Sequence, residues 1–92
     1  MEYRAVKITS RDNVAVVVQA VPRGEPVIIA TDKNALKLTA NEDVPAGHKI
    51  ALAPIKQGGG VVRYGEIIGL ATRSIRQGDW IHIHNMALPQ EN

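Results

Sequence analysis

The middle of the chain contains the segment Val44-Pro45-Ala46-Gly47-His48-Lys49-Ile50. A glycine stands three residues after one aliphatic residue and three residues before another. Glycine at this place supplies the positive φ of a type II or related turn, and the two aliphatic side chains anchor the ends of the turn in a core. The segment therefore predicts a tight corner between two strands.

The same pattern occurs three more times, in residues 21–27, 55–61 and 75–81, with Gly24, Gly58 and Gly78 at the corners. The run Gly58-Gly59-Gly60 has the composition of a phosphate-binding loop, but neither a Lys-Ser/Thr pair nor a helix start follows it. We interpret it as another corner.

Short runs rich in β-branched residues separate the corners, and each has the length of a strand. They are residues 13–18, 27–30, 35–38, 49–52, 61–64 and 81–84. Asp32-Lys33-Asn34 has the composition of a hairpin tip. Apolar residues do not recur at helical spacing over any long stretch, and only a short turn at 66–70 is expected. The sequence predicts a mainly β, compact, corner-rich fold that forms one domain over residues 1–92.

The composition narrows the classes of function. Apolar residues make up 45% and charged residues 22% of the 92 residues, which is typical of a folded domain. The absence of cysteine excludes disulfides and thiolate chemistry and agrees with a cytoplasmic location. A net charge of +2 from scattered residues, with few aromatic residues, argues against nucleic-acid binding. We also expect no membrane segment, because no apolar run is long enough.

Two of the three histidines lie in the predicted strand at 81–84. Strand alternation would turn Ile81 and Ile83 toward the core and Trp80, His82 and His84 toward the opposite face, with the two imidazoles about 7 Å apart. His82 and His84 are therefore candidates for acid/base chemistry or for binding a metal. The alternative is a solvated or interfacial pair of side chains.

Three further positions are candidates for binding. His48 and Lys49 follow the Gly47 corner directly, and functional side chains are often carried by such turns. Arg63, beside Tyr64, has the chemistry to bind a carboxylate. Each position also has a simpler interpretation as a surface residue.

Four ordered segments together resemble a known family. They are Asp12-Asn13-Val14-Ala15-Val16, Pro45-Ala46-Gly47-His48-Lys49-Ile50-Ala51-Leu52, Val62-Arg63-Tyr64-Gly65-Glu66-Ile67-Ile68-Gly69-Leu70-Ala71 and Gly78-Asp79-Trp80-Ile81-His82-Ile83-His84-Asn85. The set is similar to the SAF-type small domain of the altronate and galactarate dehydratases. The resemblance implies a β-clip fold, in the N-terminal part of a long dehydratase or in a separate short subunit.

The resemblance also implies a chemistry. Such enzymes are hydro-lyases that remove water from an aldonic or aldaric acid to give a 2-keto-3-deoxy acid, with the aid of a divalent metal, usually iron(II). This chain would contribute to a composite site with a larger catalytic subunit or domain. By this resemblance, His48, His82 and His84 are expected to act as acids or bases or to contact the substrate or a metal. Lys49, Arg63 and Asn85 are expected to bind the substrate.

Three alternatives to this function stay open. A small subunit of a sulfolactate sulfo-lyase would share the resemblance. A non-enzymatic SAF-like module that binds a ligand, and one that only orders a larger assembly, are also possible, because a fold does not fix a function. Pairing with a second copy of the chain is a further possibility, through the surface around Trp80.

Overall fold

The computed structural model describes residues 2–31 and 34–89, which form strands and turns. The strands are β1 (Tyr3–Val6), β2 (Val14–Val17), β3 (Pro26–Ala30), β4 (Ala35–Thr39), β5 (Lys49–Ala51), β6 (Gly60–Arg63), β7 (Glu66–Ala71), β8 (Trp80–Ile81) and β9 (Met86–Ala87). Within the described ranges, no helix is long and apolar enough to cross a membrane.

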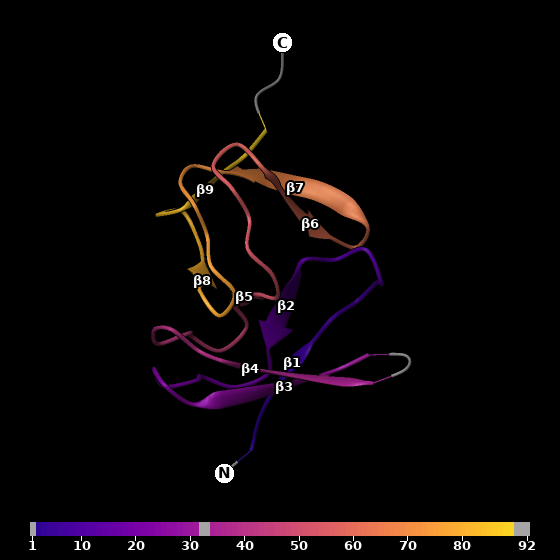
Figure 1. Ribbon diagram of the computed structural model, residues 1–92, viewed down its shortest axis with the longest axis vertical. Helices are drawn as coiled ribbons and strands as arrows, with labels where there is room; N and C mark the ends of the chain where they lie inside the picture. The colour runs from indigo at the N-terminus through magenta and orange to yellow at the C-terminus, as the bar shows by residue number, and fades with distance from the viewer. Residues whose placement is uncertain (1, 32–33, 90–92) are drawn as a thin grey trace.

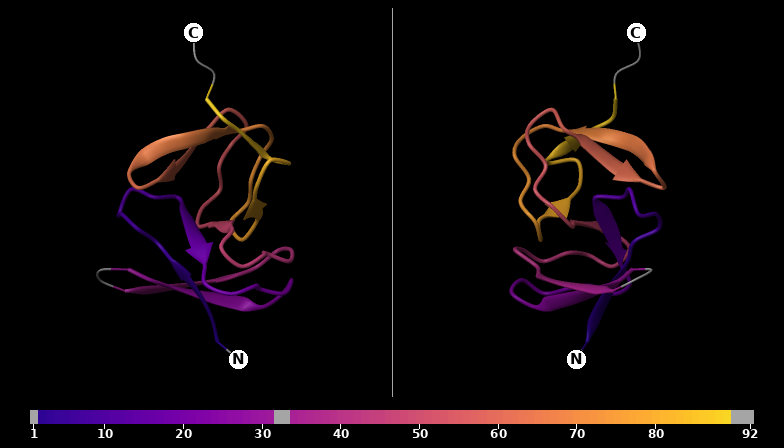
Figure 2. Two further views of the ribbon diagram at one scale, coloured as in Figure 1. Left: turned by 180° about the vertical axis from the view of Figure 1, so that it is seen from behind. Right: turned by 45° about the vertical axis from the view of Figure 1, so that its right-hand side comes forward.

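The strands form two curled sheets. The larger has the order β4-β3-β1-β2-β5-β8, and the smaller has the order β6-β7-β9. The β3–β4 hairpin lies at one end of the molecule and the β6–β7 hairpin at the other, with β2, β5 and β8 between them (Figure 1). The same arrangement is visible from behind and after a 45° turn about the vertical axis (Figure 2). The predicted β-clip fold is confirmed.

All neighbouring strands are antiparallel except β1 and β3, which are parallel. The β3–β4 register runs from Pro26 opposite Thr39 to Ala30 opposite Ala35. This pairing is the hairpin that the sequence predicted around Asp32-Lys33-Asn34, although Asp32 and Lys33 lie outside the described residues.

The four glycine corners are confirmed. Gly24, Gly47, Gly58 and Gly78 have φ values of 88°, 79°, 83° and 93°. In each corner the N–H of the next residue donates to the carbonyl two residues before the glycine, over 2.8 to 3.2 Å. Glycine at the third position of a four-residue turn with positive φ is the pattern of a type II turn.

The corners also associate in two pairs, which the sequence did not indicate. Val21 and Val44 form an isolated antiparallel bridge, and Ile55 and Ile75 form another. Each of these residues is the first aliphatic residue of its corner, and the N–H···O distances across the bridges are 2.7 to 2.9 Å. The aliphatic anchors therefore hold one corner to another as well as filling the core.

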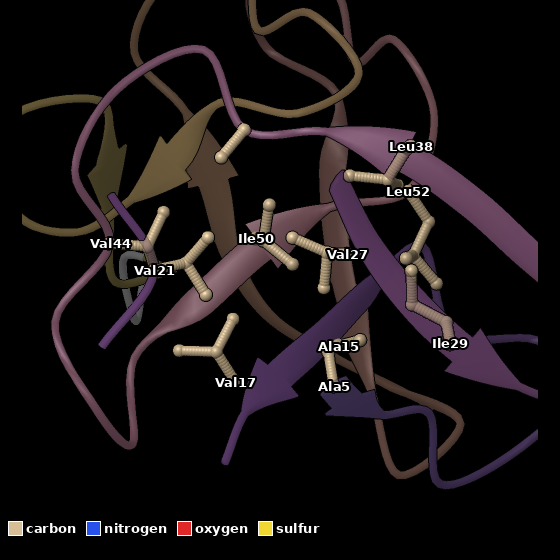
Figure 3. Packing of buried hydrophobic residues seen from close by; sticks show 11 residues of the cluster. Ala5, Ala15, Val17, Val21, Val27, Ile29, Leu38, Val44, Ile50 and Leu52 are labelled. Atoms are coloured by element: carbon tan, nitrogen blue, oxygen red, sulfur yellow. The ribbon is translucent and has the colours of Figure 1, made fainter. Parts of the chain in front are cut away.

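Two hydrophobic clusters lie on the two faces of the sheet formed by β2, β5 and β8. Alternation along β5 places Ile50 in the first cluster and Ala51 in the second. The first cluster contains Ala5, Ala15, Val17, Val21, Val27, Ile29, Leu38, Ala40, Val44, Ile50 and Leu52 (Figure 3). The second contains Val14, Ala51, Ile55, Val61, Ala71, Ile75 and Ile81.

Three local expectations need correction. Residues 66–70, expected as a short turn, belong to β7. The strand expected at 81–84 ends at Ile81, and the strands β1 and β9 were not expected at all. The connection from β6 to β7 is a two-residue turn in which both Tyr64 (φ 58°) and Gly65 (φ 73°) are left-handed, as a type I′ hairpin requires. Tyrosine is an unusual residue in this conformation, which is why the hairpin was not predicted.

Candidate functional site

The chain leaves β8 after Ile81 because Asn85 holds a turn across residues 82–85. The Asn85 side chain accepts from the His82 N–H at 3.0 Å and donates to the Trp80 carbonyl at 2.8 Å. The main-chain N–H of Asn85 also donates to the His82 carbonyl at 3.1 Å. Asn85 is only 4% exposed. The structure thus gives Asn85 a role in shaping the turn, and its contact with a substrate stays a prediction.

The turn changes the expected directions of the side chains. Ile81 is buried in the second cluster, as predicted, but Ile83 is 83% exposed and does not face the core. The alternation argument failed at Ile83 because the backbone is no longer extended there. The predicted gathering of Trp80, His82 and His84 nevertheless occurs, since the turn folds both imidazoles back over the indole.

Four rings form one group, which we call the histidine–tryptophan cluster: His48, Trp80, His82 and His84. His82 stacks on the Trp80 ring, with centroids 5.6 Å apart and planes 9° apart. The ring centroid of His84 lies 4.8 Å from that of Trp80, and the ring centroid of His48 lies 4.8 Å from that of His82. The structure thus brings together all three histidines predicted from the sequence.

His48 is fixed by a hydrogen bond to the indole. The Trp80 Nε1–H donates to His48 Nδ1 at 3.1 Å. His48 stands at the end of the Gly47 corner and immediately before β5, which pairs with β8 through Lys49–Ile81 and Ile50–Trp80. The pairing of β5 with β8 places His48 beside Trp80.

Trp80 was expected on an outward face, but it is half-buried and packs against the first hydrophobic cluster. Its main-chain N–H donates to the Glu42 carboxylate at 3.2 Å. The sequence analysis identified neither Glu42 nor Trp80 as a site residue. Trp80 could have been found because it lies two residues before His82 in the same predicted strand. Glu42 could not, because it lies 38 residues from Trp80 in the sequence.

Lys49 and Arg63 form a second group. Alternation along β5 turns Lys49 away from His48 and Ile50, toward the face of the second cluster. Partial burial, and then the positive charge of Arg63, lower the pKa of Lys49. The structure therefore brings Lys49 and Arg63 near each other and places Lys49 on the other face of the sheet from the histidine–tryptophan cluster.

Arg63 lies over the ring of Tyr64, with its guanidinium carbon 4.7 Å from the ring centroid. Its Nε atom is buried and has no hydrogen-bond partner among the described residues. Among the residues that the structure describes, neither Lys49 nor Arg63 forms an ion pair with an acidic residue. The pair suits an anion chemically, and substrate binding by Lys49 and Arg63 stays a prediction.

The histidines do not by themselves complete a metal site. Over residues 2–31 and 34–89, no group of three or more His, Cys, Asp or Glu side chains is arranged to hold a metal ion. His82 and His84 would offer two nitrogen ligands, which is fewer than the protein ligands of most zinc or non-haem iron sites. The described residues therefore do not fit a complete metal site.

Comparison with known proteins agrees with this architecture. The profile of the altronate/galactarate dehydratase SAF domain matches residues 3–89. The chain belongs to this family of SAF domains.

Three relatives show how this SAF domain is used elsewhere. It is 36% identical to galactarate dehydratase (L-threo-forming) and 38% identical to altronate dehydratase, both of Escherichia coli (strain K12), and each match covers 92% of the chain. The matches cover only 15% and 16% of those enzymes. It is also 32% identical to (2R)-sulfolactate sulfo-lyase subunit alpha of Chromohalobacter salexigens, over 77% of the chain and 78% of that subunit.

Proposed function

We propose that this SAF domain is the small part of a sugar-acid hydro-lyase and supplies the histidine–tryptophan cluster to a composite active site. The observation that carries the proposal is the convergence of all three histidines on Trp80. Imidazoles are the side chains most often used as acids and bases in enzymes, and three of them lie together on one half-exposed surface. The larger dehydratase part would cover this surface.

The reaction has three requirements. A base removes the proton beside a carboxylate, a cation or donors stabilise the enediolate, and an acid protonates the departing hydroxyl. The cluster offers donors and proton carriers but lacks a complete metal site in the described residues. The divalent metal, iron(II) in our proposal, would supply Lewis acidity and be held mainly by the larger part.

Co-expression with a large dehydratase component tests the proposal. Formation of 2-keto-3-deoxy acid from D-altronate and D-galactarate is measured anaerobically with ferrous iron, with and without this chain. We expect turnover to require the chain and to fall about 100-fold or more in His48→Ala. Arg73→Ala, at an exposed residue between β7 and the Gly78 corner, is the control and should keep full turnover. Turnover that ignores the chain would contradict the proposal.

The same experiment separates an assembly role from a catalytic one. If the domain only orders the larger part, His48→Ala and His82→Ala would leave turnover intact, whereas removal of the whole domain would abolish assembly. Size-exclusion chromatography of the complex therefore accompanies each assay, so that a loss of turnover is interpreted only where the complex still forms.

A second candidate is the small subunit of a sulfo-lyase. It is motivated by the match to the sulfo-lyase subunit of Chromohalobacter salexigens, which is 32% identical and covers 78% of that subunit. Release of sulfite from (2R)-sulfolactate, with no dehydration of either sugar acid, would select this function.

A further inference from the structure

The hydrogen bond between Trp80 and His48 decides which imidazole nitrogen carries the proton. An indole N–H donates and never accepts, so His48 Nδ1, 3.1 Å away, must accept. An accepting Nδ1 has a free lone pair, and the neutral ring then carries its proton on Nε2. The distance is within the normal range for an N–H donor.

The indole is held in place from several sides. The Trp80 N–H donates to Glu42 and the Trp80 carbonyl accepts from Asn85, so its backbone is fixed on both sides of the side chain. His82 stacks on one face of the ring. His48 is fixed as well, because its N–H donates to Pro45 and its carbonyl accepts from Val17. Turning either ring away would break its contact with the ring of His82 and the hydrogen bond between Trp80 and His48.

We infer that Trp80 is a positioning residue that holds His48 as the neutral Nε2–H tautomer, so that His48 serves the reaction as a hydrogen-bond donor and not as the base. The tautomer follows from the contact alone, and its use in catalysis rests on the proposed function. A base at Nε2 needs the proton on Nδ1, where it would point at the indole N–H. The Nε2–H instead suits an oxygen of the substrate, such as the carboxylate or the enediolate.

This assignment divides the work among the histidines. His48 binds and stabilises oxygen, with no proton transferred from its ring. Removal of the proton beside the carboxylate is left to a group of the larger part or to His82, whose ring is stacked on Trp80 and tilted against His48.

Nitrogen NMR tests the tautomer directly. In the ¹⁵N-labelled chain at a pH where the imidazoles are neutral, long-range ¹H–¹⁵N correlations distinguish a protonated Nε2 from a protonated Nδ1. We expect His48 as the Nε2–H form, and a mixture of tautomers in Trp80→Phe. Tyr64→Phe, an exposed aromatic residue outside the cluster, is the control and should leave His48 unchanged. A native Nδ1–H form, or a Trp80→Phe spectrum identical to the native one, would overturn the inference.

Two substitutions of His48 test its use in the complex. Glutamine keeps an N–H donor near the position of Nε2 and cannot act as a base. We expect His48→Gln to keep turnover within about 10-fold of the native complex, and His48→Ala to lose about 100-fold or more. Equal inactivity of both variants would show that His48 is the base and overturn the assigned role. Turnover indifferent to both would count against the proposed function, whereas the NMR result would still stand.

Discussion

Asp12 is buried at the junction of two loops, where its charge is held by several donors. It is 4% exposed and accepts from the Thr9 hydroxyl at 2.6 Å, the Thr9 N–H at 3.1 Å and the Gly65 N–H at 2.9 Å. Burial alone would raise the pKa of Asp12, but these bonds and one from the Tyr64 backbone outweigh it and lower the pKa to about 2. The residue ties the loop before β2 to the β6–β7 hairpin.

Replacing this carboxylate should destabilise the fold. The pKa falls from 3.8 in the unfolded chain to about 2, so the ionised form contributes about 2 kcal/mol, present above pH 3.8 and lost as the pH falls toward 2. We expect Asp12→Asn to lower the free energy of unfolding at pH 7 by about 2 kcal/mol and to flatten its decline in acid. Urea titrations at several pH values measure both effects.

Asp43→Asn is the matched control, because Asp43 also accepts from a backbone N–H, that of Arg23, but at an exposed site. It should cost less than about 1 kcal/mol. Equal effects of the two variants would mean that the buried carboxylate contributes no more than an exposed one.

Lys49 should also make stability rise with pH, but in an alkaline range and because the fold disfavours its charged form. Its pKa in the fold is lowered from 10.5 by burial and by Arg63, so between that lowered value and 10.5 the unfolded chain binds more protons. Stability should therefore rise with pH through this window. Lys49→Met removes the charge and keeps the length of the side chain, so it should stabilise the domain at pH 7 and remove the rise.

The control for Lys49 is Lys56→Met, at an exposed corner position. It should keep the pH-dependent rise, which urea unfolding from about pH 7 to about pH 10 would detect. A native domain whose stability is flat over that range would contradict the account of Lys49.

The candidate residues of the site could be chosen from the sequence, but their geometry could not. His48, His82 and His84 were identified from their places beside a corner and in an alternating run, and they do meet. Alternation gave the wrong direction for Ile83, because it cannot reveal that Asn85 stops the strand. The bond from Trp80 to His48 spans 32 residues, and only the pairing of β5 with β8 creates it.

At the scale of the elements, the glycine corners were predictable because each is a local device. A turn that needs positive φ at one residue selects glycine wherever it occurs, so four copies were visible in the sequence. The joining of the corners in pairs, Val21 with Val44 and Ile55 with Ile75, depends on contacts between distant residues. No local pattern specifies which corner meets which.

The corners should differ in their tolerance of alanine. At Gly78 a Cβ atom would lie 2.2 Å from the Thr39 carbonyl oxygen, whereas at Gly24 no atom lies within 4 Å. Both have similar positive φ, 93° and 88°, so the conformational cost of about 1–2 kcal/mol is shared. We expect Gly24→Ala to cost that amount and Gly78→Ala about 3 kcal/mol or more in thermal or urea unfolding. Equal costs would show that the β4 end moves freely away from the Gly78 corner.

At the scale of the whole molecule, the strands β2, β5 and β8 lie between the two hydrophobic clusters and contribute side chains to both. Neighbouring residues on the same strand serve different clusters: Val14 and Ala15 on β2, and Ile50 and Ala51 on β5. Such a strand cannot separate from one cluster without exposing the other. The described strands should therefore unfold as one cooperative unit even though their apolar contacts form two groups.

A pair of small core substitutions tests this cooperativity. Ile50 is buried in the first cluster and Ile75 in the second, and Ile→Val at either should cost about 0.5–1.5 kcal/mol. Trp80 packs against the first cluster, so its fluorescence reports that side, whereas far-UV circular dichroism reports all strands. We expect both signals to change at one urea midpoint in each variant, with the slope unchanged. A urea midpoint of fluorescence that shifts in Ile50→Val but not in Ile75→Val would mean that the two clusters unfold independently.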